Sequence, residues 1–154
     1  MVESQPSKLL VAGPIPVSRS SFRPHAVPQI TGKFSVSMLP PPSTGESSFV
    51  RLLIDKEFEG GLLGNSRVEM LASNRGDQPA GGYVALERFT GSLDGRDGSF
   101  IMQHSGTMSP GSSNLQVLIT PGSGTGALAG IEGRLEIRRE GKQHFYDLTY
   151  TLSS

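Results

Sequence analysis

Polar residues that could do acid–base chemistry stand within otherwise apolar stretches of this 154-residue sequence. The candidate catalytic residues are Glu69, Glu87, Gln103, His104 and Tyr146. A carboxylate enclosed by apolar side chains resists ionisation, so burial would raise the pKa of Glu87 and suit it to general acid or base catalysis near neutral pH. Gln103, His104 or Tyr146 would then hold an oxygen atom of the substrate.

Apolar and aromatic neighbours of these groups are candidates for lining a substrate pocket. They are Tyr83, Phe89, Met102 and Tyr150. Successive side chains of a strand face opposite sides, so Glu87 shares a face with Tyr83 and Phe89, and His104 shares one with Met102. The sequence leaves open which face is interior.

Each of these features has a plainer alternative. An outward Glu87 would pair with Arg134 or Arg138 of a neighbouring strand, and such a surface ion pair is worth about 0–1 kcal/mol. The stripe of Tyr146 and Tyr150 is also typical of an ordinary core, in which buried hydroxyl groups need hydrogen-bond partners or a position near a barrel mouth.

Cofactor and metal sites are not indicated. His25, His104 and His144 are far apart and lack the paired spacing of zinc ligands. The glycine-rich runs 60–64 and 122–126 lack the Gly-Lys-Ser/Thr and the following helix of a phosphate loop. The Gly-Ser-Gly at 122–124 also lacks the spacing of a nucleophile elbow. We therefore expect no cofactor and no metal, and interpret these glycines as tight turns and bulges.

The elements that must position the candidate residues are short strands with alternating polarity. We expect eight, at residues 33–38, 49–58, 65–72, 83–90, 99–107, 114–120, 134–139 and 144–152. Asp94-Gly95 and Asp97-Gly98 are both typical of hairpin turns. Even spacing without a clear helix indicates an all-β sandwich or barrel, and a closed barrel of roughly eight strands has room for side chains or one small ligand.

The first 29 residues differ from the rest of the chain. Eight of the eleven prolines lie before residue 43, and residues 1–29 show no sustained periodicity. We expect an N-terminal extension at 1–29 and a β-barrel domain at 30–154. The extension is either a disordered tail or a strap held on the barrel by Val11, Ile15, Val17 and Phe22.

Composition excludes several classes of protein. The formal net charge is zero, which argues against binding nucleic acid by counterion release. Twenty glycines argue against a helical bundle, and the absence of cysteine excludes a disulfide scaffold. No apolar stretch is long enough for a membrane span or a secretory signal, so we expect a soluble cytoplasmic protein without membrane partners.

Several motifs resemble the bacterial domain-of-unknown-function family 3224 (DUF3224). The resemblance covers roughly residues 30–152, and the 29-residue lead is a departure from it. The motifs are LERFTGSLDGRDGSF at 86–100, MQHSGT at 102–107, PGSGTG at 121–126, LAGIEG at 128–133 and FYDLTY at 145–150.

A wider similarity points to allene oxide cyclases and plant dirigent proteins. It is carried by the glycines at 122–124 and 130–133, the alternating stretch 135–137 and the aromatic stretch 145–150. The resemblance implies an eight-stranded antiparallel barrel, often oligomeric, that steers ring closure or coupling of a reactive small molecule without a cofactor. The pocket carboxylate motif of the cyclases has no counterpart here that can be aligned.

Three functions of different classes follow. The first is a cofactor-free isomerase or cyclase that acts on an apolar small molecule in biosynthesis. The second is a lipocalin-like barrel that binds such a molecule without changing it. The third is a barrel with a filled interior whose role is to assemble into a homo-oligomer.

Overall fold

A computed structural model describes residues 27–40, 48–75 and 77–153 of the chain. The proposed N-terminal strap, with Val11, Ile15, Val17, Phe22 and His25, therefore lies outside the described residues. The strands are β1 (Gln29–Leu39), β2 (Val50–Gly60), β3 (Leu62–Ala72), β4 (Gly81–Leu93), β5 (Arg96–Ser109), β6 (Ser112–Ile119), β7 (Thr125–Gly126), β8 (Ile131–Glu140) and β9 (Gln143–Leu152). In this part of the chain no helix is formed, so none is present that could cross a membrane.

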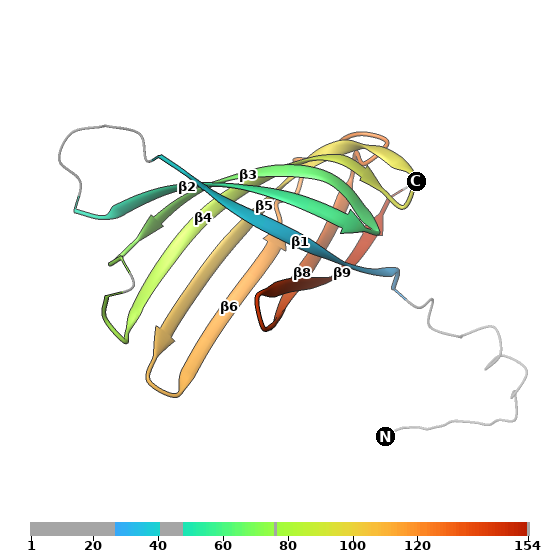
Figure 1. The fold of residues 1–154 in the computed structure, drawn as a ribbon. Coiled ribbons are helices and arrows are strands. Elements are labelled where there is room, and N and C mark those ends of the chain that lie inside the picture. The colour runs from blue at the N-terminus through green and yellow to red at the C-terminus, as the bar shows by residue number, and fades with distance from the viewer. Residues whose placement is uncertain (1–26, 41–47, 76, 154) are drawn as a thin grey trace, which may run out of the picture.

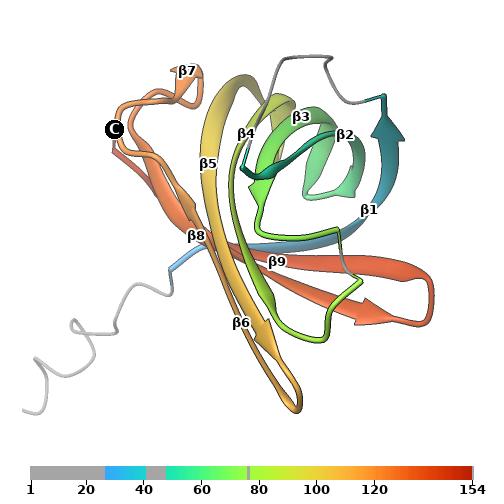
Figure 2. The same cartoon turned by 90° about the vertical axis from the view of Figure 1, so that its left-hand side faces the viewer.

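Eight of these strands close into an antiparallel barrel, as the alternating pattern predicts (Figures 1 and 2). The order around the barrel is β4-β3-β2-β1-β9-β8-β6-β5, and pairing of β4 with β5 closes it. The two-residue β7 adds to one end of β5 at Gly98 and Ser99. Closure satisfies the backbone groups that an open sheet would leave at its edges.

One of the two expected hairpin turns is confirmed. Asp94 and Gly95 both have positive φ, 49° and 84°, and form the two-residue turn between β4 and β5. This backbone matches the right-handed twist of the strands that it joins. The other expectation is wrong, because Asp97 and Gly98 lie inside β5 and pair with Ser92 and Gly91. Because β4 continues to Leu93 and β5 begins at Arg96, the turn at Asp94 and Gly95 already joins the two strands, and a second turn is not required.

A pair of glycines lets the sheet bend sharply where β3 meets β4. Gly64 and Gly91 face each other in the register. A Cβ atom on Gly91 would lie 2.2 Å from the carbonyl oxygen of Leu63, and one on Gly64 would lie 2.3 Å from that of Thr90. The close backbone approach therefore requires glycine at both positions.

One half of the barrel is filled by its own side chains. Its buried cluster includes four phenylalanines, two tyrosines and several aliphatic residues, and Phe58 contacts Phe34, Phe89 and Tyr146 through their rings. This closed half contains the β2–β3 and β4–β5 turns and the C-terminal ends of β4 and β9 (Figure 1).

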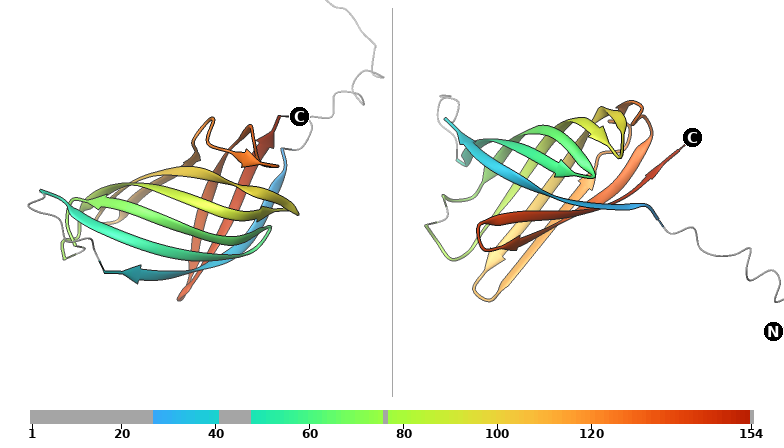
Figure 3. Two further views of the ribbon diagram at one scale, coloured as in Figure 1. Left: turned by 90° about the horizontal axis from the view of Figure 1, so that it is seen from above. Right: turned by 45° about the vertical axis from the view of Figure 1, so that its right-hand side comes forward.

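The other half of the barrel is open on one side. Strand β9 pairs with β1 only as far as Phe34, so residues 35–39 of β1 have a strand neighbour only in β2. Across the gap, β6 pairs with β8 at a single position, Leu118 with Arg134. The β8–β9 hairpin stops short of the far ends of the neighbouring strands, which extend past it (Figures 1 and 3). We call this region the open half.

Candidate functional site

A buried polar cluster lies between the closed and open halves. Strand alternation turns Glu87 of β4 inward, where its side chain is 1% exposed. Its Oε1 atom accepts hydrogen bonds from Lys56 Nζ at 3.0 Å and contacts His104 Nε2 at 2.7 Å. The hydroxyl of Ser66 donates to its Oε2 atom. Four neighbouring strands, β2 to β5, thus converge on one carboxylate, and we call these residues the Glu87 cluster.

The pKa of Glu87 moves opposite to the sequence-based expectation. Burial raises it, but the hydrogen bond from His104, the attraction of Lys56 and His104, and the Ser66 hydroxyl together lower it to about 2. An ionised carboxylate is therefore the stable form at neutral pH. The inward orientation of Glu87 was correctly foreseen as one alternative, whereas the expected rise of its pKa is wrong. A catalytic role for Glu87 stays a prediction.

The outward alternative for Glu87 is also excluded. Arg134 pairs with Glu136 at 3.6 Å, and Arg138 pairs with Asp147 at 2.8 Å and Glu140 at 3.2 Å. These pairs lie on the outer face of β8 and β9, across the barrel wall from the Glu87 cluster.

Lys56 and Ser66 are members of the Glu87 cluster that the sequence analysis did not single out. A signal was present, because Lys56 occupies an inward position between Ile54 and Phe58, and Ser66 occupies one next to Val68. A charged or hydroxyl group on the apolar face of a strand requires a partner. Lys56 has a second contact as well, because its Nζ atom lies 4.7 Å from the ring centroid of Phe34.

Tyr83 lies beside the Glu87 cluster, on the side of the open half. Its ring centroid is 6.5 Å from that of His104. Burial and the charge of Glu87 both raise the pKa of its hydroxyl, which is protonated at neutral pH. Among the described residues no hydrogen-bond partner is recorded for that hydroxyl, so it is a half-buried donor facing the open half.

Inward-facing apolar side chains of the open half remain exposed. Val36 is 40% exposed, Met38 59% and Leu115 44%. Their positions in the register place them on the face that points into the barrel, with Val36 opposite Lys56 and Met38 opposite Ile54. These exposed side chains lie beside a second, smaller buried cluster of Ile54, Val68 and Ala85, against which Met70 and Tyr83 pack, so this half combines a small core with an apolar lining that meets solvent.

Tyr146 and three of the expected pocket residues belong to the closed half. Phe89, Met102 and Tyr150 lie in the buried cluster, and none of the four pockets described below includes them. The Tyr146 hydroxyl accepts a hydrogen bond from the backbone N–H of Leu62 at 2.7 Å and donates to the carbonyl oxygen of Glu59 at 3.1 Å. Its donor and acceptor are both used inside the protein, which matches the core interpretation of this residue.

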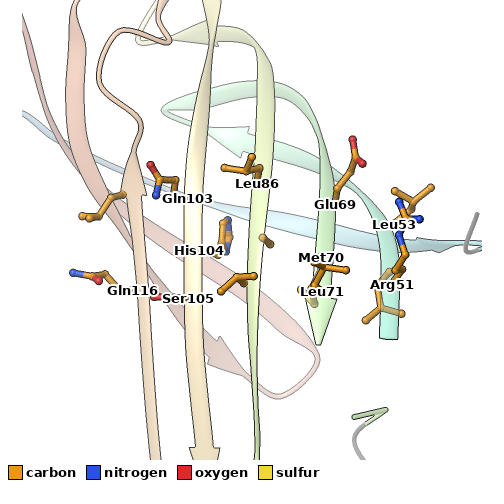
Figure 4. A pocket seen from close by; sticks show the side chains of 14 residues that line it. Arg51, Leu53, Glu69, Met70, Leu71, Leu86, Gln103, His104, Ser105 and Gln116 are labelled. Atoms are coloured by element: carbon orange, nitrogen blue, oxygen red, sulfur yellow. The ribbon is translucent and has the colours of Figure 1, made fainter. Parts of the chain in front are cut away.

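Glu69 and Gln103 face the outside of the barrel and are not brought together with Glu87. They line a cavity of about 740 Å³ on the outer face of β2 to β6 (Figure 4). A second cavity of about 580 Å³ adjoins it and shares Leu71, Val84 and Ser105. We call the two together the outer groove. Two further pockets among the described residues also lie on outer faces, near Thr125 and near Phe145.

The described part of the chain holds no group of three or more His, Cys, Asp or Glu side chains placed to bind a metal ion. His104 is committed to Glu87, whereas His144 stacks on Phe34 with ring centroids 5.1 Å apart. Burial, Arg139 and Lys56 lower the pKa of His144.

Comparison with known proteins places the chain among proteins without an assigned activity. The sequence model of the family described as "Protein of unknown function (DUF3224)" matches residues 30–150. A solved structure from Shewanella oneidensis MR-1, described as a protein with unknown function from that family, is 37% identical. It superposes with a TM-score of 0.73, covering 82% of this chain and 98% of that one. No curated protein matches the sequence.

Proposed function

The chain belongs to the DUF3224 family, and we propose that its barrel binds a small apolar molecule in the open half, with one polar end of that molecule at Tyr83. The observation that carries the proposal is the Tyr83 hydroxyl, a half-buried donor without a recorded partner among the described residues. An acceptor on a ligand would pair with this hydroxyl, and a typical hydrogen bond contributes about 0.5–1.5 kcal/mol.

The lining of the open half fits the apolar part of such a ligand. Val36, Met38 and Leu115 point inward yet remain exposed, and Leu52 and Met70 are half-buried beside them. Binding sites for small molecules are mostly apolar with a few fixed polar groups. Covering these side chains would add about 25 cal/mol per Å² of apolar surface removed from water.

The Glu87 cluster supplies fixed electrostatics at the inner end of that site. Replacing a buried ion pair by apolar residues is often neutral or stabilising, so such a cluster is poorly explained by stability alone. We interpret it as a set of groups that holds His104 in one orientation 6.5 Å from the Tyr83 ring. The ligand class that suits this end carries a carbonyl, ether or hydroxyl oxygen.

A cofactor-free isomerase or cyclase is the second candidate function. The observation that favours it is the position of the Tyr83 hydroxyl, a donor, beside the His104 ring at one end of an apolar lining. The Tyr83 hydroxyl would polarise an oxygen atom of a reactive substrate while the lining folds its chain, as the resemblance to allene oxide cyclases suggests. In this reaction Glu87 would act as a positioning residue, because it is ionised and enclosed.

Fluorescence titration with 1-anilinonaphthalene-8-sulfonate, an apolar dye with a polar end, tests the proposal on the full chain. We expect saturable binding, a loss of about tenfold or more in affinity for Met38→Asp, and about fivefold for Tyr83→Phe, which removes one hydrogen bond. Leu86→Asp is the matched control, because it introduces the same charge in the outer groove.

Two outcomes would contradict the proposal. One is equal dye affinity in Met38→Asp and the unaltered protein, and the other is loss of binding in Leu86→Asp alone. Circular dichroism of each variant checks that the fold is intact, which is expected because both side chains are exposed. Native mass spectrometry of a ligand carried through purification then separates the two candidates, since a carrier returns the molecule unchanged and a cyclase returns a product.

A further inference from the structure

Strand β8 carries three arginines, and one of them is placed differently from the other two. Arg134 and Arg138 lie on the outer face, where both form ion pairs with nearby acids. Arg139 instead follows Leu135 and Ile137 on the face that turns to the barrel interior. Strand alternation thus puts a charge at a position where this strand otherwise presents an apolar side chain.

Arg139 stands at the edge of the open half. Its partner in the register is His144 of β9, and His144 in turn lies opposite Phe34 of β1, where the pairing of β9 with β1 ends. The end of the β8–β9 hairpin therefore borders the gap in the barrel wall (Figure 1). No ion pair of Arg139 is recorded within residues 27–40, 48–75 and 77–153, so a ligand in the open half would meet a guanidinium that no described acid engages.

The inward face beside the open half carries more positive than negative charge. Glu87 is the one acid at an inward position of the eight barrel strands, whereas Lys56 and Arg139 both occupy inward positions next to the gap or the Glu87 cluster. Lys56 lies 3.0 Å from the Glu87 carboxylate and balances its charge. The charge of Arg139 is left over, and a ligand with one negative group would balance it.

The two ends of the open half suit different groups of a ligand. At the inner end, burial and the charge of Glu87 both raise the pKa of the Tyr83 hydroxyl, so a second negative charge placed there would be disfavoured. At the gap, burial, Arg139 and Lys56 lower the pKa of His144, which shows that positive charge prevails there. A neutral oxygen atom therefore fits the inner end, and an anionic group fits the gap.

We propose that the ligand of the open half is an apolar acid, whose negatively charged group pairs with Arg139 at the gap while a neutral oxygen atom accepts the Tyr83 hydroxyl at the inner end. This inference rests on the proposed function, because it assigns the charge and the orientation of the molecule bound there. The planar fork of a guanidinium matches the two oxygen atoms of a carboxylate. His144, held by stacking on Phe34 with ring centroids 5.1 Å apart, offers a ring N–H beside the same group.

Two dyes that differ by one charged group test the proposal on the full chain. The dye 1-anilinonaphthalene-8-sulfonate carries a sulfonate, and N-phenyl-1-naphthylamine has the same rings without it. We expect Arg139→Gln to weaken binding of the sulfonate dye about fivefold or more, because a charge-assisted contact is lost, and to change binding of the neutral dye less than about twofold. Arg139→Lys keeps the charge and should recover most of the lost affinity.

Two further variants serve as controls. Arg134→Gln removes the same charge from the outer face of the same strand, so it should leave the affinity for both dyes within about twofold. Met38→Asp alters the apolar lining that both dyes would share, so it should weaken both. Circular dichroism of each variant verifies that a loss of binding is not a loss of the fold.

The outcomes separate this inference from the proposed function. If neither dye binds saturably, or if Met38→Asp leaves both affinities unchanged, the site itself is absent and the inference falls with it. If both dyes bind and Met38→Asp weakens both, but Arg139→Gln spares the sulfonate dye or weakens the two dyes equally, the site stands and its selectivity for an acid is wrong. An equal loss in Arg134→Gln would also overturn the inference, because the dye would then respond only to net charge.

Discussion

A single side chain, Glu87, shows how charge and burial are balanced in this barrel. Its carboxylate is enclosed, so ionisation would be costly if it stood alone. Lys56, Ser66 and His104 each direct a polar atom to it, and together they outweigh burial. The negative charge of Glu87 therefore holds Lys56, Ser66 and His104 together. The same charge would be unfavourable in this enclosed position if these three partners were absent. Removing any member leaves the others enclosed and underpaired.

The pH dependence of stability follows from that balance. The pKa of Glu87 falls from 4.5 in an unfolded chain to about 2 in the fold. Because the folded value is the lower one, Glu87 stabilises the fold above pH 4.5, and this contribution is lost as the pH falls from 4.5 towards 2. We expect Glu87→Gln to lose about 3 kcal/mol of unfolding free energy at pH 7 and to show a flatter dependence below pH 4.5.

Urea unfolding at several values of pH measures both effects. Glu69→Gln is the control, because Glu69 is exposed on the outer face and its amide should leave stability within about 0.5 kcal/mol. An acid-induced loss of stability of the same size in Glu87→Gln and in the unaltered protein would show that other carboxylates are responsible.

At the scale of elements, Tyr146 joins strands that are distant in the sequence. Its hydroxyl holds the backbone of Glu59 and Leu62 on both sides of the β2–β3 turn, while its ring packs on Phe58. These hydrogen bonds join β9 to the turn between β2 and β3, although β1 lies between β9 and β2 in the sheet. The same aromatic residue closes one end of the barrel and satisfies a backbone N–H that is buried there.

Tyr146→Phe should therefore destabilise the fold by about 1–3 kcal/mol, because it leaves the N–H of Leu62 without an acceptor. Tyr150→Phe is a matched control on the same strand face, since Tyr150 is also buried but its hydroxyl makes no hydrogen bond with residues 27–40, 48–75 or 77–153. Thermal or urea unfolding compares the two. Equal losses would mean that the Tyr146 hydroxyl contributes nothing beyond its place in the core.

Strand alternation made the eight strands and their common inward face predictable from the sequence. Phe100, Met102 and His104, for example, do share a buried face as their spacing requires. What alternation cannot supply is which residues meet across the barrel. Lys56 and Ser66 are 31 and 21 residues from Glu87, and their contact depends on register and closure. The direction of the Glu87 pKa change was missed for that reason.

The extent of each strand was a second element that the sequence left open. The early end of the β8–β9 hairpin leaves residues 35–39 of β1 without a neighbour on one side. No local pattern shows where a strand loses its neighbour in the barrel. Val36 and Met38 alternate with polar residues as regularly as buried residues do. A packed interior was expected as one alternative and an open one as another, and the barrel combines both in its two halves.

At the scale of the whole molecule, this division predicts uneven local stability. The closed half contains the aromatic cluster, and residues 83–93 of β4, which run into it, are paired with β3 on one side and β5 on the other. In the open half, alternate amides of residues 35–39 point to the missing strand and have no ladder hydrogen bond. Such segments open with low free energy, whereas the most stable core amides exchange only with global unfolding.

Hydrogen exchange measured by mass spectrometry should therefore separate the two halves. We expect amides of residues 86–93 to exchange at least ~100-fold more slowly than those of residues 35–39. A ligand in the open half would slow exchange in residues 35–39 and leave 86–93 unchanged. Uniform protection of 35–39 and 86–93 in the free protein would instead mean that the open half is covered, and the site proposed there would be closed to ligand.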